Sequence, residues 1–540
     1  MLHVGGVSSL LKEGTKHLSG VQEAVVKNID ACQQFSQIVR TSMGPQGMNK
    51  MIINQHDKLF VTNDAATIIK ELDVIHPAAK MLVMASQMQE QECGDCTNLV
   101  LSFGGELLLQ AEALIRTGLH PSEIISGYTK AGDKVQEILE GLTCYTCEDI
   151  RSTDEVAECI KTAIAAKQYG YEEFLASLIA KSCVSILPKN PKNFNVDNVR
   201  VTKILGGGVV DSKVLKGFVI VRDTAGTIKH VTSAKVAVFA AGIDISRTET
   251  KGSVVLKTAE ELLNYSKDEE KAMEEIIKAV SESGAKVVVS GGNIGEMAMH
   301  FLERYNLMAI KVQSKFQLRR LCKAVGAVPL VRMGAPTPEE LGYCDVVSVE
   351  EIGSTKVCVF RQDAEDSAIS TIIVRGSTQN LLDDIERAVD DGVNVFKGIV
   401  KDPRFVAGAG GAEIELARQL TAFAESSPGL DQYAIKKYAE SLEIVPRILA
   451  ENAGRSSTAT ISALYAAHSA GKVHDGVDVE NPGGTVDTSA ARIIDLQSAK
   501  ASAIRLATDA ALTILRVDQI IMAREAGGPK PPAQGSRDSD

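Results

Sequence analysis

The sequence lacks the charge balance and the long apolar runs of a nucleic-acid-binding or membrane protein. Its 540 residues include 58 lysines and arginines against 69 aspartates and glutamates, so the formal net charge is -11. A chain with this balance has no global basic field to attract nucleic acid or an anionic membrane. No apolar run approaches the roughly 18 residues of a membrane span, and residues 1–18 contain no secretory signal core. We therefore expect a cytoplasmic protein with no nucleic-acid or membrane partner.

Cysteine is also scarce. The 10 cysteines are scattered along the chain, a pattern that predicts reduced thiols. Two CxxC pairs, Cys93 with Cys96 and Cys144 with Cys147, make a four-thiolate zinc site formally possible. The gap between the pairs is much longer than the usual spacing of roughly 15 to 20 residues. We therefore expect neither a zinc site nor redox chemistry.

The sequence has no Walker A phosphate loop, GxxxxGK[ST]. The sequence instead contains short loops that carry glycine or aspartate and lie directly before predicted helices. Residues 94–98 carry Asp95 just before an amphipathic helix. Free N–H groups at a helix N-terminus favour an anion such as phosphate, and Asp95 could hold the Mg²⁺ that accompanies phosphates. The alternative is that Asp95 only caps the helix, since aspartate is a favoured N-cap residue.

Other loops have related chemistry. Residues 41–50 offer two glycines, two hydroxyls and a lysine. Residues 63–67 place Asp64 at the start of another helix, where an isolated aspartate would act as a cap. Residues 408–411 form a further glycine-rich loop before a helix, and the acid-rich residues 381–391 are typical of a solvated helix face.

The chain is long enough for about three to four compact units at roughly 150 residues each. Both ends follow a helical period, over residues 21–43 and up to residues 503–521, whereas the middle contains apolar runs typical of strands. These runs are residues 199–222, 235–240, 285–290, 308–312 and 328–331. Because helical stretches separate the last three runs, the pattern predicts a small α/β domain.

Three segments near or beyond this middle region stand apart. Residues 291–295, GGNIG, follow a predicted strand and raise a dinucleotide-site hypothesis, although their spacing departs from GxGxxG. Residues 248–281 are rich in glutamate and lysine and resemble a protruding arm. The Gly/Pro/Ser tail over residues 525–540 is predicted to be disordered.

Taken in order, the loops resemble the nucleotide loops of group II chaperonins. The matching segments are residues 41–50, 62–67, 94–98, 386–391, 408–411 and Asp495, and the match covers nearly the whole chain. Residues 47–51, 386–392 and 526–532 resemble one subunit type of the eukaryotic cytosolic chaperonin. The resemblance implies a multidomain α and α/β chaperonin fold. Its parts would be a mainly helical equatorial ATPase domain (1–147 and 405–524), an intermediate domain (148–215 and 371–404) and an α/β apical client-binding domain with a helical protrusion (216–370).

The resemblance also implies a function. The chain would be an ATP-dependent chaperone subunit in a cytosolic double ring of paralogous subunits, with ATP and Mg²⁺ as cofactors. ATP-driven lid closure would assist the folding of clients such as actin and tubulin. Phosphoryl transfer to water needs charge neutralisation and an oriented nucleophile more than covalent catalysis, which suits carboxylates, a metal and backbone donors.

Residue roles follow from the same resemblance. Asp391 would be the catalytic carboxylate, assisted by Asp64, and Asp95 would coordinate Mg²⁺. The residues implied to contact the nucleotide are Gly44, Pro45, Gly47, Thr97, Asn98, Lys167, Gly408, Gly410 and Asp495. Among these, Thr97 would hold phosphate and Lys167 would sense the γ-phosphate, while Gly410 and Asp495 match the base and ribose side.

The sequence departs from the family pattern in the phosphate loop. Cys96 stands where the family has glycine, and Ala409 stands inside a glycine triplet; Asn49, Asn98 and Leu496 depart as well. If residue 96 needs a left-handed backbone, its side chain costs roughly 1 to 2 kcal/mol, enough to weaken nucleotide binding about tenfold. Two alternatives therefore stay open beside the chaperone: a scaffold subunit that binds nucleotide poorly, and a stand-alone ATPase.

One predicted helix in the middle region has a basic side. Leu318, Leu321, Cys322 and Val325 recur at helical spacing and should face the core. The cations left on the other side are Lys315, Arg319, Arg320 and Lys323. The corresponding helix of group II chaperonins borders the client-binding surface, so the resemblance implies that this basic stripe faces the cavity and selects acidic or polar client segments. The alternative is a solvated helix face.

Overall fold

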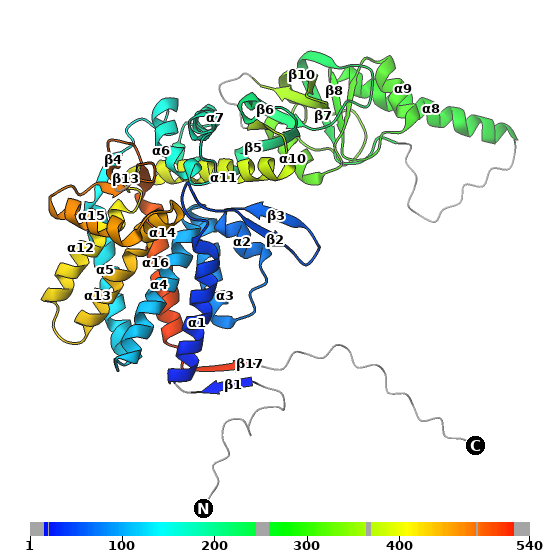
Figure 1. The fold of residues 1–540 in the computed structure, drawn as a ribbon. Helices are drawn as coiled ribbons and strands as arrows, with labels where there is room; N and C mark the ends of the chain where they lie inside the picture. The colour runs from blue at the N-terminus through cyan, green and yellow to red at the C-terminus, as the bar shows by residue number, and fades with distance from the viewer. Residues whose placement is uncertain (1–15, 20, 245–258, 363–368, 482–483, 523–540) are drawn as a thin grey trace, which may run out of the picture.

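The computed structural model describes residues 16–19, 21–244, 259–362, 369–481 and 484–522. Figure 1 shows an elongated molecule with a helical body at one end and a sheet-containing body at the other. The predicted tail and the first part of the predicted arm, residues 248–258, lie outside the described residues.

The helical body is made from both ends of the chain. Its N-terminal helices are α1 (Val21–Arg40), α2 (Ala65–Glu71), α3 (Pro77–Glu92), α4 (Thr97–Arg116) and α5 (Pro121–Gly141). Its C-terminal helices are α12 (Gly411–Ser426), α13 (Asp431–Leu442), α14 (Ile444–Asn452), α15 (Ser457–Ser469) and α16 (Gln497–Leu515). One cluster of buried apolar side chains joins the two sets, running from Val25 to Leu139 and again from Val406 to Leu515.

Short strands complete the helical body. They are β1 (Lys16–Ser19), β2 (Lys50–Ile53), β3 (Leu59–Thr62), β4 (Thr143–Thr146), β13 (Arg404–Ala407), β14 (Asp475–Val477), β15 (Thr485–Asp487), β16 (Ile494–Leu496) and β17 (Gln519–Met522). β1 pairs antiparallel with β17, so the first and last described strands lie side by side (Figure 1). β13 lies between β16 and β4 in a small sheet.

Helix α4 lies at the centre of this body because it is apolar on nearly every side. Gly105 allows α1 to approach closely, since a Cβ at this position would lie 2.5 Å from the Cβ of Ser36. Contrary to the expectation from the sequence, α4 is long and apolar enough by composition to cross a membrane. It is the one such helix in the described part of the chain, and 67% of its apolar window is buried inside the fold, as in a core helix.

The other body contains an eight-stranded mixed sheet. The strands are β5 (Val199–Leu205), β6 (Lys213–Ile220), β7 (His230–Phe239), β8 (Val287–Ser290), β9 (Met308–Lys311), β10 (Gly342–Ile352), β11 (Thr355–Arg361) and β12 (Ser370–Gly376). Their order is β5-β12-β6-β11-β10-β7-β8-β9. The helices of this body are α8 (Ala259–Glu282), α9 (Glu296–Arg304) and α10 (Lys315–Val325). α8 projects away from the sheet in Figure 1, and its C-terminal part packs Met273 and Ile277 into the same core as Phe301.

Three further helices lie between the two bodies: α6 (Thr153–Ala165), α7 (Glu172–Ser185) and α11 (Gln379–Lys401). They share a buried cluster that includes Ile160, Ile179 and Phe396. α11 extends from beneath the sheet to the helical body (Figure 1), so its acidic residues span both regions.

Two local predictions are wrong. Residues 328–331 form no named strand, and Leu330 makes only an isolated bridge to Phe239. Helix α16 ends at Leu515, and residues 519–522 form β17 instead of continuing the helix to residue 521. Ile520 and Ile521 are β-branched, and their strand partner β1 comes from the opposite end of the chain, which a local period cannot reveal. The proposed domain boundaries stay a prediction.

Candidate functional site

A cavity of about 520 Å³ opens where the helical body meets α6 and α11. The predicted site residues that line it are Gly44, Pro45, Asp64, Asp95, Thr97, Asn98, Lys167, Asp391, Gly410 and Asp495. Gly47 and Gly408 do not line it. A Cβ at Gly47 would lie 2.4 Å from the carbonyl oxygen of Ser42, and one at Gly408 would lie 2.8 Å from that of Ile493, so both glycines allow close backbone contacts behind the wall.

The loop before α4 forms one end of the cavity. Cys96 is the N-cap residue of α4 and has a left-handed backbone with φ 65°. The Asp95 carboxylate accepts a 2.6 Å hydrogen bond from the Cys96 N–H, so it lies beside the first turn without being the cap residue itself. Burial raises the pKa of Asp95, although this bond opposes the shift. The end of the cavity therefore combines a half-buried carboxylate with the N-terminus of a long helix.

Buried amides hold this loop in place. The Gln89 side-chain amide donates to the carbonyl oxygens of Asp95, at 2.9 Å, and Ala499, at 3.0 Å. Asn98 donates from its amide to the Ser42 hydroxyl at 3.2 Å. These bonds connect the loop to α16 and to the loop after α1, which fixes the relative positions of the cavity walls.

A lysine bridges two carboxylates at the next part of the wall. The Lys167 ammonium lies 2.8 Å from the Asp64 carboxylate and also pairs with Asp391. Asp64 at the same time caps α2, accepting from the Thr67 N–H at 3.0 Å and from its hydroxyl at 2.7 Å. The capping role expected for Asp64 is therefore confirmed, and the carboxylate has a second partner as well.

One ammonium cannot neutralise all the negative charge here. Burial alone would raise the pKa of Asp64, but the charge of Lys167 and the bonds from Lys167 and Thr67 lower it to about 2. Burial raises the pKa of Asp391 well above its usual value, because Lys167 only partly offsets burial and the charges of Asp64 and Asp95. Burial would lower the pKa of Lys167, but Asp391 and Asp64 outweigh it and keep the lysine charged.

The acid-rich segment of α11 is therefore not simply a solvated face, as its composition indicated. Asp391 is buried, and Lys203 pairs with Asp383 and Glu386, each at 2.6 Å. Composition alone could not reveal these partners because they lie on distant segments of the chain.

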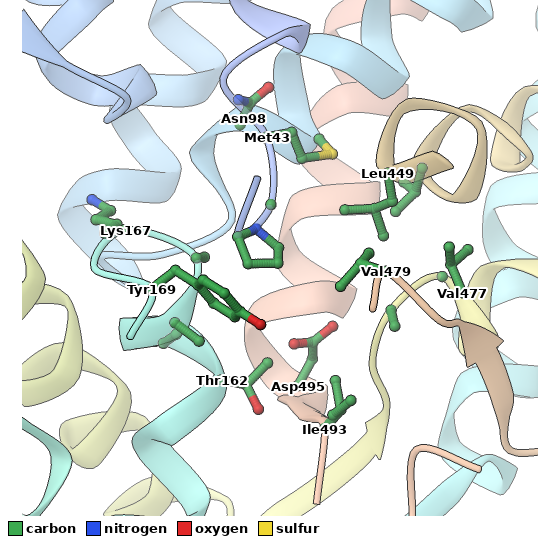
Figure 2. Close-up of a pocket in the computed structure, with 18 of the residues that line it drawn as sticks. Met43, Asn98, Thr162, Lys167, Tyr169, Leu449, Val477, Val479, Ile493 and Asp495 are labelled. Atoms are coloured by element: carbon green, nitrogen blue, oxygen red, sulfur yellow. The ribbon is translucent and has the colours of Figure 1, made fainter. Parts of the chain in front are cut away.

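The other end of the cavity is more apolar. Figure 2 shows Asp495 and Tyr169 facing the same space, with Leu449, Val477 and Val479 on its opposite side. Gly410 is the N-cap residue of α12 with φ 80°, and Ala409 before it also has a left-handed backbone, with φ 50°.

Two cavity residues, Lys500 and Tyr169, and one residue behind the cavity wall, Arg455, were not predicted from the sequence. Lys500 lies beneath Asp495, and Tyr169 donates a 2.7 Å hydrogen bond to Glu480. Arg455 donates to the carbonyl oxygens of Asp478, Asn481 and Val479, the last at 2.7 Å, and so fixes the loop after β14. None of them belongs to a glycine-rich or acidic motif, so the sequence offered no local signal.

Other predicted sites have simpler structural explanations. A Cβ at Gly291 would lie 2.4 Å from the Ala240 carbonyl oxygen, and one at Gly292 would lie 2.7 Å from the Gly242 nitrogen, so chain packing accounts for these glycines. The paired cysteines are free thiols. Among the described residues, no group of three or more His, Cys, Asp or Glu side chains is arranged to hold a metal ion.

On α10, the predicted core residues Leu318, Leu321, Cys322 and Val325 are all buried, as expected. Lys315, Arg319 and Lys323 are exposed, and Lys323 donates a 2.7 Å hydrogen bond to the side chain of Asn198. Arg320 is half-buried. Burial and the charge of Arg320 lower the pKa of Arg200 on β5, so Arg320 is the α10 cation whose charge acts on that strand.

Comparison with known proteins identifies the family. The TCP-1/cpn60 chaperonin family matches residues 35–525. The chain belongs to this family. The resemblance inferred from the loops is thus confirmed, and the molecule has the multidomain α and α/β fold of a chaperonin, in a family whose members are ATPases.

Full-length relatives of this chaperonin chain carry the name T-complex protein 1 subunit theta. The relative from Dictyostelium discoideum is 59% identical over 535 residues, covering 99% of each chain. The one from Arabidopsis thaliana is 56% identical and covers 97% of this chain and 96% of its own. The one from Homo sapiens is 55% identical, covering 99% of this chain and 97% of its own.

Proposed function

We propose that this chaperonin chain is the theta-type subunit of a cytosolic hetero-oligomeric double ring, TRiC/CCT, and couples ATP hydrolysis to the folding of clients such as actin and tubulin. The observation that carries the proposal is the single cavity in which Asp95, Asp64, Asp391 and Lys167 meet the N-terminus of α4. The helical body would be the equatorial domain, the α6, α7 and α11 region the intermediate domain, and the sheet body the apical domain that closes as a lid.

The residues present fit Mg²⁺ and ATP. Mg²⁺ usually takes one or two carboxylates together with phosphate oxygens and water, so the absence of a three-ligand group among the described residues does not disfavour it. Asp95 is the half-buried carboxylate that lines the cavity beside the helix N-terminus, and it would hold the ion. The cavity volume of about 520 Å³ lies within the range of roughly 300 to 1,000 Å³ typical of small-molecule sites. When bound, the ion would neutralise phosphate charge.

The remaining roles, phosphate binding and water activation, would fall to side chains and backbone amides of the cavity. Thr97 and the free amides of α4, with Gly44 and Pro45 opposite, would hold phosphate oxygens, and Lys167 would contact the terminal phosphate. Asp391 has a raised pKa in a buried setting, which suits a carboxylate that orients water and accepts its proton. Asp64, held ionised by Lys167, would support the same end electrostatically.

A second candidate is a scaffold subunit that binds nucleotide weakly. Cys96 and Ala409, with φ 65° and φ 50°, hold left-handed conformations that favour glycine, and both line the cavity. The native mass of the purified particle, measured together with its ATPase rate, separates the candidates. A ring with turnover supports the chaperone, a ring without nucleotide occupancy supports the scaffold, and a monomer with turnover supports a stand-alone ATPase.

Two substitutions test the division of roles. Asp391→Ala should slow hydrolysis by about 100-fold or more while nucleotide stays bound, because it removes a proton acceptor. Asp95→Ala should reduce both hydrolysis and occupancy. Asp390→Ala is the matched control, since Asp390 is the neighbouring α11 carboxylate and does not line the cavity. Equal loss of bound nucleotide in the Asp391 and Asp95 variants would reject the assignment.

A further inference from the structure

A buried lysine lies beneath the more apolar end of the cavity. Lys500, on the first turn of α16, is only 2% exposed. Its ammonium lies 2.8 Å from one carboxylate oxygen of Asp495, Oδ2, and 3.0 Å from the Glu413 carboxylate. It also donates to the carbonyl oxygen of Ala407 at 3.3 Å. All the donors of an ammonium group are therefore engaged by fixed acceptors.

The three charged groups are not equally accessible. The side chains of Lys500 and Glu413 are each 2% exposed, whereas that of Asp495 is 31% exposed and faces the cavity (Figure 2). Glu413 lies in the first turn of α12, where the helix dipole favours a negative charge. Lys500 and Glu413 thus form a rigid support, and Asp495 is the member that can meet a ligand.

The position of Asp495 in the cavity indicates which part of a bound nucleotide it would contact. Asp95, Lys167, Val477 and Val479 all line the cavity. A nucleotide with its phosphates at the end that carries Asp95 and Lys167 would place its sugar between that end and the apolar wall of Val477 and Val479. A carboxylate at that point accepts hydrogen bonds from sugar hydroxyls, as acidic residues do in dinucleotide sites. Because Lys500 holds Oδ2, the Oδ1 atom is the oxygen left to accept from a ligand.

We infer that Lys500 is a positioning residue that fixes Asp495 as the acceptor for the ribose hydroxyls, so that a buried lysine acting through Asp495 sets the preference for ribonucleotides over 2′-deoxynucleotides. The inference rests on the proposed nucleotide function. Without Lys500, the Oδ2 atom of Asp495 loses its fixed partner, so the carboxylate can rotate away from the sugar whether or not Glu413 is charged. In the single variant, repulsion between the two carboxylates adds to this loss. The ligand then meets a carboxylate that is no longer held in position, and the hydrogen bond to the sugar weakens.

The experiment measures the affinities of the purified full-length chain for Mg-ATP and Mg-2′-deoxyATP by calorimetry. A hydrogen bond to a charged acceptor corresponds to roughly a tenfold to hundredfold difference in affinity, so the natural chain should prefer ATP by about tenfold or more. Lys500→Met should reduce this ratio to about twofold or less. The double variant Lys500→Met/Glu413→Gln removes the uncompensated buried glutamate and should show the same reduced ratio in a stably folded chain.

Asp495→Asn should lower the ratio as much as Lys500→Met does, and combining the two should have little further effect. Lys436→Met, at an exposed position of α13 outside the cavity, is the matched control and should keep the natural ratio. The inference is overturned if the double variant keeps the natural ratio, if both nucleotides weaken equally, or if the natural chain binds both nucleotides alike. If the natural chain binds neither nucleotide, the proposed function itself fails, which is a distinct result.

Discussion

At residue 96, a side chain occupies a conformation that favours glycine. Cys96 has φ 65° and ψ 20°, and burial raises the pKa of its thiol well above the usual value. The thiol therefore stays protonated and behaves as a small apolar group, with no role as a nucleophile. The sequence predicted a cost at residue 96 only if the backbone there is left-handed, and the structure confirms that conformation.

Cys96→Gly should relieve the strain. The free energy of unfolding should rise by roughly 1 kcal/mol. Nucleotide binding should tighten by up to about tenfold, because the loop would adopt its binding conformation in a larger fraction of molecules. Urea unfolding and nucleotide titration measure the two effects. Cys93→Gly is the matched control, because Cys93 has φ -111° and glycine there should destabilise the helix end. If both quantities stay unchanged in the Cys96 variant, the strain argument is wrong.

Glu90, on α3, makes the stability of the fold depend on pH. Burial, reinforced by the charge of Asp64, raises the pKa of Glu90 from 4.5 to about 7. The folded state then binds this proton more tightly than the unfolded chain, so Glu90 lowers stability as the pH rises from about 4.5 to about 7, and the loss persists above pH 7.

Glu90→Gln removes that dependence. Its Tm should equal that of the natural chain below about pH 4.5, exceed it increasingly up to about pH 7 and remain higher above it. Thermal unfolding in EDTA across this range measures the difference without a bound metal. Glu92→Gln, at an exposed position of the same helix, serves as the control. A Tm difference that does not vary with pH would show that titration is not its cause.

At the scale of elements, helical periods predicted faces well but could not assign partners. The buried side of α10 follows directly from the spacing of Leu318 and Leu321, because a 3.6-residue period fixes which side chains share a face. The same period places Arg320 among the exposed cations, whereas in the structure it is half-buried and its charge lowers the pKa of Arg200 on β5. The partner of a polar side chain depends on tertiary packing, so it cannot be predicted from the sequence of one helix.

Three exposed cations on α10 form the client surface that we propose. Phe316, 76% exposed, lies beside Lys315 on the same helix, so an apolar contact accompanies the charges. Reversing Lys315, Arg319 and Lys323 to glutamate should reduce crosslinking of an acidic client severalfold at low salt. The effect should shrink at physiological salt, where the Debye length falls to about 8 to 10 Å and exposed charges are screened.

Glutamine at the same three positions supplies the control for charge. Crosslinking should fall to an intermediate level with glutamine and further with glutamate, while ring assembly and ATP turnover stay at the natural level. If the glutamate and glutamine variants both crosslink the client as well as the natural chain does at low salt, these residues are a solvated face and the client contact lies elsewhere.

At the scale of the whole molecule, the cavity depends on contacts between segments far apart in the chain. Glycine and aspartate loops revealed the family because their order along the sequence is distinctive. Lys500 and Gln89 could not be found this way, because each lies inside an ordinary helical stretch. Gln89 gains its partner on α16 only when α3 packs beside that helix, and Lys500 gains Glu413 only when the start of α16 meets α12. Such side chains are visible in the fold because their buried polar atoms need partners.

Tyr169 joins two of these distant segments across the cavity. It follows α6 on the loop that carries Lys167, and its hydroxyl donates to Glu480 on the loop after β14. The hydrogen bond to Glu480 raises the pKa of Tyr169, so the hydroxyl remains a donor at neutral pH. Both residues line the cavity. We therefore expect their hydrogen bond to hold the loop after α6 against the loop after β14 and to slow the escape of bound nucleotide.

Tyr169→Phe should therefore speed nucleotide dissociation by about two- to tenfold, the effect of one net hydrogen bond, with little change in association. Stopped-flow displacement of a fluorescent ADP measures both rates. Glu480→Gln should have a similar effect, and the double variant should be no faster than either, because each removes the same bond. Tyr433→Phe, at an exposed position on α13 away from the cavity, is the matched control. Dissociation at the natural rate in the Tyr169 variant, or additive effects in the double variant, would show that the bond does not retain the nucleotide.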